Sequence, residues 1–104
     1  RELSGIIELA RRNGSIDDCL VANGCQIFGT VRHSIVSTDA CVGEHAVVED
    51  SILLPGSRVK DGAHVVRAIL GENSTVEENV NLGSVDMTKD TAVVGNDVVV
   101  GKGE

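Results

Sequence analysis

The chain has 104 residues, with one Phe, no Trp or Tyr, twelve Gly and a formal net charge of −7 at pH 7. Its length predicts one domain. The acidic balance excludes a nucleic-acid binder and a protein that docks on an anionic membrane face, because both need clustered Lys and Arg. With one Phe as the only aromatic residue, the core must be built from Val, Ile and Leu, which favours a narrow β interior.

Residues 1–14 lie outside the pattern that fills the rest of the chain. Here Leu3, Ile6, Ile7 and Ala10 have the spacing of one face of a helix. We expect an N-terminal arm or short helix that covers the open edge of the following domain, since the ends of repeat folds need such caps. A frayed terminus is the alternative.

From residue 15 onward, aliphatic residues recur at a nearly constant interval, and the last step is one residue longer than the two before it. The three columns are Val42, Val59, Val76 and Val94; Val48, Val65, Leu82 and Val100; and Ala46, Ala63, Val80 and Val98. A solenoid, in which each coil stacks on the one before, has this kind of period. The unit is a hexapeptide, three to a coil. It predicts an all-β, single-stranded left-handed parallel β-helix of about five coils over residues 15–104, without a protruding loop.

The same register predicts which polar residues stack on one another. The expected stacks are Arg32 on Glu49; His33 on Asp50 on Arg67; Lys60 on Glu77; and the turn residues Gly62, Asn79 and Asp97. Opposite charges on neighbouring strands favour such a register.

Three histidines could in principle bind zinc, but His33, His45 and His64 fall in different columns of the repeat. They therefore cannot converge within one chain, and we expect surface histidines and no metal site. An acyltransferase could use His45 or His64 as a general base, but it would need a projecting loop to enclose its acyl donor.

An acidic column of Glu44, Asp61 and Glu78, continued by Asn96, could hold a divalent cation or form a solvated edge. The four residues Arg58, Lys60, His64 and Arg67 lie in one coil and are candidates for binding a phosphorylated effector. Pairing with the acidic residues of neighbouring coils, Glu77 and Asp50, explains the presence of Lys60 and Arg67 equally well.

No nucleotide loop, catalytic carboxylate pair or nucleophile motif occurs in the sequence, so we expect no catalytic residue and no cofactor in this chain. The odd number of cysteines, Cys19, Cys25 and Cys41, without CxxC spacing, favours reduced thiols that act as small apolar fillers. We therefore expect a cytoplasmic protein.

Three strings carry a family resemblance: Cys19–Ile27, Gly29–Val36 and Val42–Gly56. The most specific part is an unusually short first coil, followed by the string Ser-Ile-Leu-Leu-Pro-Gly that ends at Gly56. The chain resembles the C-terminal β-helix of bacterial ADP-glucose pyrophosphorylase (glucose-1-phosphate adenylyltransferase), whether of its catalytic or its regulatory-type subunit.

The resemblance implies a parent nucleotidyltransferase of glycogen biosynthesis. In that family an N-terminal domain, with Mg²⁺, joins ATP to glucose 1-phosphate, giving ADP-glucose and pyrophosphate. The β-helix supports homo- or hetero-oligomers and allosteric control by sugar phosphates or nucleotides. The catalytic domain is absent from this sequence, so we expect an excised domain, or else a diverged stand-alone relative. The rivals are a small hexapeptide acyltransferase or carbonic-anhydrase-like trimer, and a bare scaffold for association.

Overall fold

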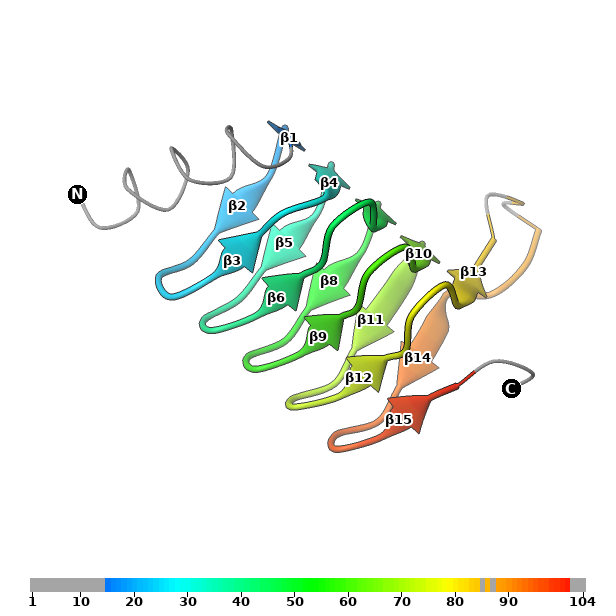
Figure 1. Cartoon of the computed structure of the whole chain (residues 1–104). Coiled ribbons are helices and arrows are strands. Elements are labelled where there is room, and N and C mark those ends of the chain that lie inside the picture. Colours follow the sequence, from blue (N-terminus) through cyan, green and yellow to red (C-terminus); the bar gives the residue numbers. More distant parts are fainter. Residues whose placement is uncertain (1–14, 85, 87, 102–104) are drawn as a thin grey trace.

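The computed structural model describes residues 15–84, 86 and 88–101, and every regular element within them is a short β-strand. Fifteen strands form three parallel sheets of five strands each (Figure 1). Consecutive strands belong to different sheets, so each coil contributes one strand to each wall of a three-sided prism. This confirms the predicted all-β hexapeptide solenoid and is consistent with a left-handed β-helix. The expected N-terminal arm lies outside the described residues.

The three walls are called sheets A, B and C. Sheet A contains β1 (Ser15–Asp17), β4 (Thr30–Arg32), β7 (Val47–Glu49), β10 (His64–Val66) and β13 (Asn81–Gly83). Sheet B contains β2 (Leu20–Val21), β5 (Ile35–Val36), β8 (Ile52–Leu53), β11 (Ala68–Leu70) and β14 (Ala92–Val94). Sheet C contains β3 (Gln26–Ile27), β6 (Cys41–Val42), β9 (Arg58–Val59), β12 (Thr75–Val76) and β15 (Val99–Val100).

Each strand directs an aliphatic side chain into the prism, and β11 directs two, Ala68 and Leu70. In sheet C, Val42 pairs with Val59 and Val59 with Val76, and all three are almost completely buried. Each such side chain contributes about 1.5–3 kcal/mol on burial. The first coil is shorter, since Ile27 pairs with Val42, as the sequence predicts. The interior is thus a stack of Val, Ile and Leu, which explains why the fold needs no aromatic residue.

The last coil differs from the prediction. Val76 pairs with Val100 rather than Val94, and Val94 instead pairs with Leu70 in sheet B. The final step along sheet C is therefore longer than predicted. Three further residues lie in other columns than predicted. The Val98 carbonyl accepts from the Thr75 amide, the Asp97 amide donates to the Glu72 carbonyl, and the side-chain Oδ1 of Asn96 accepts from the Glu72 amide.

The extra length forms a loop that the sequence did not predict. One residue separates β10 from β11, whereas residues 84–91 separate β13 from β14. Figure 1 shows the described part of this segment leaving the prism at the corner between sheets A and B. The expectation of no protruding loop is wrong, because a run of valines near residue 94 imitates an early return to the core.

Tight corners require backbone conformations with positive φ. The corner between sheets A and B is formed by residues with φ values between 50° and 55°: Asp18, His33, Asp50 and Arg67. At the corner between sheets B and C, Gly56 (φ 76°) lies against Asn73 of the next coil. A Cβ at Gly56 would meet the Oδ1 end of the Asn73 side chain, which would have to move. Glycine is therefore favoured here, whereas Asp39 and Asn73 occupy the same corner in neighbouring coils with positive φ.

The part of the chain that the structure describes contains no helix long and apolar enough to cross a membrane.

Candidate functional site

The four candidate effector residues share one coil but lie on two walls and two corners. Arg58 is exposed on the outer face of sheet C, and His64 is exposed at the start of β10 in sheet A. Lys60 follows β9, and its Nζ lies 3.6 Å from Oε1 of Glu77, as the register predicts. The structure therefore spreads these residues over the surface, and an effector site built from all four stays a prediction.

Arg67 holds the inserted loop. Its guanidinium Nη1 donates to the carbonyl oxygens of Asp86 at 2.9 Å and Lys89 at 3.1 Å. Inside the loop, the Asp86 carboxylate accepts hydrogen bonds from the Thr88 hydroxyl at 2.7 Å and amide at 2.9 Å, which lower the pKa of Asp86. Arg67 thus serves as a clamp, a role that the sequence did not reveal.

Alternating charges line the corner between sheets A and B, and we call them the corner ladder: Asp18, His33, Asp50 and Arg67. His33 Nδ1 lies 2.8 Å from Asp50 Oδ1, and its Nε2 lies 3.5 Å from Asp18 Oδ2. The hydrogen bond to Asp50 and the negative charge of Asp18 raise the pKa of His33. The predicted stacking of His33 on Asp50 is confirmed, as is Arg32 on Glu49, where Nε donates to Oε2 at 2.9 Å.

The other histidines lie elsewhere. His45 occupies the corner between sheets C and A, and His64 lies at the end of its strand opposite the inserted loop. Among the described residues, no group of three His, Cys, Asp or Glu side chains could hold a metal ion.

The acidic column is confirmed only in part. Gly62 donates its amide to the Glu44 carbonyl and Asn79 donates to Asp61, so Glu44, Asp61 and Glu78 follow the register of the inward columns. The Glu44 amide itself donates to Asp61 Oδ1 at 3.0 Å. Asn96 does not continue this column, because it lies beside Glu72 at another corner.

The cysteines are free thiols in the structure. Cys25 is buried and fills the interior, with its Sγ 2.9 Å from the Ser37 carbonyl oxygen. Cys41 instead lies on the outer face of β6, so the filler role predicted for it is wrong. Burial raises the pKa of both thiols, which keeps them protonated at neutral pH.

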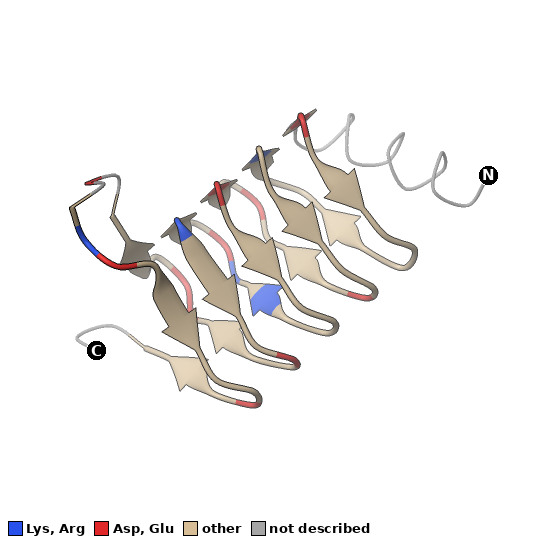
Figure 2. Cartoon of the chain, turned by 180° about the vertical axis from the view of Figure 1, so that it is seen from behind, with Lys and Arg blue, Asp and Glu red and all other residues tan. Residues whose placement is uncertain are grey.

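Sheet B carries an outward row of aliphatic side chains that the sequence reasoning missed. We call it the aliphatic ladder; its paired members are Leu20, Ile35, Ile52, Ile69 and Val93. The five strands of this wall contain no Lys, Arg, Asp or Glu, and Figure 2 shows the charges gathered mainly at the corners. The sequence does contain a signal for this row: in every coil an aliphatic residue directly precedes the inward residue of sheet B.

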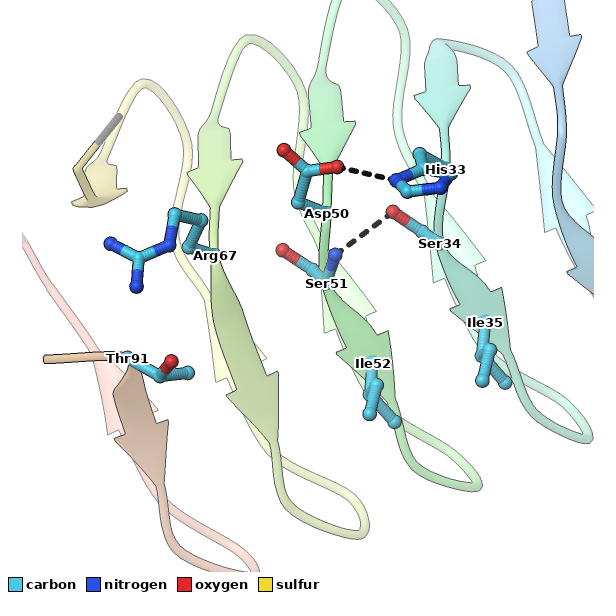
Figure 3. Close-up of a pocket in the computed structure, with 8 residues that line it drawn as sticks. All are labelled: His33, Ser34, Ile35, Asp50, Ser51, Ile52, Arg67 and Thr91. Carbon is cyan, nitrogen blue, oxygen red and sulfur yellow. Dashed lines mark hydrogen bonds and ion pairs between the residues drawn. The ribbon is translucent and has the colours of Figure 1, made fainter. Parts of the chain in front are cut away.

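Shallow grooves run along the same wall. One has a volume of about 530 Å³ and lies between the corner ladder and the aliphatic ladder, with Arg67 and Thr91 at its rim (Figure 3). Another, more apolar, is lined by Leu20, Ile35 and Pro55 among others. Figure 3 shows Ile35 and Ile52 side by side on neighbouring strands. This wall offers apolar area edged by charge, an arrangement suited to binding another macromolecule.

Curated relatives share part of this sequence. Glucose-1-phosphate adenylyltransferase of Desulfitobacterium hafniense is 40% identical over 68 residues, which cover 65% of this chain and 17% of that protein. The protein of that name from Acetivibrio thermocellus is 36% identical over 70 residues, which cover 67% of this chain and 16% of that protein. The protein of that name from Desulforamulus reducens is 30% identical over 86 residues, which cover 77% of this chain and 22% of that protein. The matches fall in the C-terminal region of these proteins.

The chain thus spans less than a quarter of the length of these relatives. A family model described as GlmU-like, C-terminal hexapeptide, matches residues 6–102. That match covers almost the whole sequence and agrees with the three-sheet solenoid described above. The chain therefore belongs to the GlmU-like C-terminal hexapeptide family.

Proposed function

We propose that this chain is a non-catalytic assembly and regulatory domain of a glucose-1-phosphate adenylyltransferase-like protein. The observation that carries the proposal is the position of the match: relatives of that name align with this chain only in their C-terminal region. The parent reaction would join ATP and glucose 1-phosphate in a separate domain, with Mg²⁺ bound there. This domain would supply surfaces for assembly in the cytoplasm and for control of glycogen biosynthesis.

The geometry supports a binding role better than a catalytic one. The grooves are shallow and open onto flat walls, whereas catalytic sites for small molecules are enclosed. His33 is engaged by two carboxylates, and Arg67 is engaged by the inserted loop. A sugar phosphate or nucleotide effector would bind Arg58, Lys60 and His64 and would compete with Glu77 for the Lys60 ammonium.

Three measurements test this role. The isolated chain should form no ADP-glucose from ATP, glucose 1-phosphate and Mg²⁺ above a contaminant-controlled blank, and it should self-associate in sedimentation equilibrium. Turnover that follows the protein through purification, or a strictly monomeric chain at high micromolar concentration, would overturn the proposal. Calorimetric titration with a sugar bisphosphate should give heat that Arg58→Ala and Lys60→Ala reduce.

One observation favours the acyltransferase alternative as a second candidate. That function requires a projecting loop, and residues 84–91 provide one. The loop leaves the prism at the corner between sheets A and B, away from His45 at the corner between sheets C and A. Release of free thiol from acetyl-coenzyme A in the presence of amine or sugar acceptors would support this candidate.

A further inference from the structure

The aliphatic ladder is the surface of this protein that most needs an explanation. Leu20 and Val93 are 70% and 71% exposed and Ile35 is 41% exposed, while Ile52 and Ile69 are half-buried. Single exposed apolar residues are ordinary, but a row on five adjacent strands forms one patch, and such patches mark interaction sites. Sheets A and C differ, because Arg32, Glu49 and Arg58 lie in their strands.

We propose that the outer face of sheet B packs against the same face of a second copy of this chain, with the two prisms antiparallel. The proposal rests on the assembly role proposed above and names the wall that performs it. Two flat sheets pack well face to face when their inner side chains are aliphatic. A two-fold axis makes the contact self-complementary and closed, as in most symmetric dimers.

The charges of the corner ladder determine which coils of the two copies face each other. Each of its members precedes a member of the aliphatic ladder by two residues, so it borders the packed face. With the two-fold axis between the second and third coils, Asp18 faces Arg67 of the second copy and His33 faces Asp50. Every pair then combines an acidic with a basic group. His33 and Arg67 keep their contacts within their own chain, so they act across the contact through their charge rather than by forming new ion pairs. Centring the axis on the third coil would instead place Asp50 opposite Asp50, which is unfavourable.

This register also accommodates the rest of the wall. It sets Ile35 against Ile52 and Leu20 against Ile69 of the second copy, so four strands of each sheet overlap. Val93 of the fifth coil lies beyond the four overlapping strands, and the inserted loop borders the contact where it binds Arg67. Four strands spaced about 4.8 Å apart give a contact smaller than the usual ~800 Å² per partner. A dimer that dissociates in the micromolar range is therefore expected.

A matched pair of substitutions tests the wall. Ile52→Glu places a carboxylate at the centre of the aliphatic ladder, and Val47→Glu places one on the outer face of sheet A in the same coil. We expect Ile52→Glu to raise the dimer dissociation constant at least about tenfold, and Val47→Glu to change it less than about twofold. Sedimentation equilibrium across the micromolar to millimolar range measures both, and circular dichroism confirms that each variant folds.

Cysteine pairs test the orientation without adding charge, in a background with Cys19→Ser and Cys41→Ser. A mixture of Ile35→Cys and Ile52→Cys chains should form disulfide-linked dimers on mild oxidation. Val93→Cys alone should not, because the two copies of this residue lie about five coils, or roughly 24 Å, apart in the proposed register. Efficient linkage of Val93→Cys to itself would overturn the antiparallel arrangement.

The outcomes separate this inference from the assembly role. If the unmodified chain dimerises and Ile52→Glu dimerises equally well, sheet B is not the interface, while assembly through another surface stands. If the unmodified chain is monomeric throughout the range, both the interface and the assembly role fail.

Discussion

Nδ1 of His33 lies 2.8 Å from Oδ1 of Asp50, the residue at the same corner of the next coil. Both residues have positive φ, and their side chains meet between the two coils. With Asp18 on the other side, His33 connects the first three coils along one edge of the prism. Its protonation should therefore affect how firmly these coils stack.

Stability should depend on pH through His33. The carboxylate of Asp50 raises the pKa of His33 above its ordinary value of 6.5, so the folded state binds the proton more tightly than the unfolded state. The added stability is complete below the unfolded pKa and is lost as the pH rises through the folded pKa. We expect the melting-temperature advantage of the native chain over His33→Gln to fall by about 1–3 °C between about pH 5.5 and 8. A constant difference across that range would contradict this.

The interior should not accept a charge. Val59→Asp puts a carboxylate between Val42 and Val76, two residues that are almost wholly buried. It should cost several kcal/mol of unfolding free energy. Glu78→Ala, on the exposed acidic column, should be neutral or slightly stabilising because it removes a like charge near Asp61. Urea unfolding of both variants gives the ranking, and the reverse order would show that the interior column is misassigned.

Two buried serines of one coil should respond in opposite ways to alanine. The Ser57 hydroxyl is fully buried and makes no hydrogen bond, and Ala40 occupies the equivalent position one coil earlier. The Ser51 hydroxyl donates to the Glu49 carbonyl at 2.8 Å and accepts from the Ala68 amide at 3.1 Å. We expect Ser57→Ala to be neutral or stabilising by up to about 1 kcal/mol, and Ser51→Ala to destabilise by about 1–3 kcal/mol. Denaturant melts measure both; destabilisation by Ser57→Ala would indicate an unseen partner, such as a buried water.

The inserted loop should depend on Arg67. Arg67→Ala removes the donors to the Asp86 and Lys89 carbonyls, so the loop should open more often. We expect tryptic cleavage after Lys89 to become at least about threefold faster, with Arg58→Ala as the control that leaves this rate unchanged. Mass spectrometry of timed digests follows that one bond. Equal cleavage rates in both variants would mean that the loop is held by other contacts.

The repeat predicted most of this fold because inward residues return at nearly constant intervals. The equal steps from Val42 to Val59 to Val76, and the short first coil, are as predicted. The register predicted for the last coil was wrong. Val94 follows Val76 at almost the same interval, so it resembles a return to the same wall. The hydrophobic pattern alone cannot distinguish an early valine from one delayed by a loop.

The site was harder to predict than the fold. Stacking along corners follows from register, so the pairs Arg32–Glu49 and Lys60–Glu77 were predictable. Two features were not. The clamp of Arg67 depends on backbone carbonyls of the loop, which carry no sequence signal. The aliphatic ladder was visible as paired aliphatic residues, but only the wall's geometry shows that one residue of each pair points outward.

The contact of Gly56 with Asn73 limits how such a chain can grow. At this corner Gly24 lies under Asp39 and Gly56 under Asn73, so a bare Cα in one coil receives a longer side chain from the next. Duplicating the coil that carries Gly56 would place one glycine on another and lose that fit, so this part of the chain keeps it only when it lengthens by pairs of coils. The limit ends at the fourth coil, because Asp97 follows Asn73 at the same corner and its amide donates to the Glu72 carbonyl. Two longer side chains are thus accepted in succession there, and the prism could be lengthened one coil at a time beyond that point.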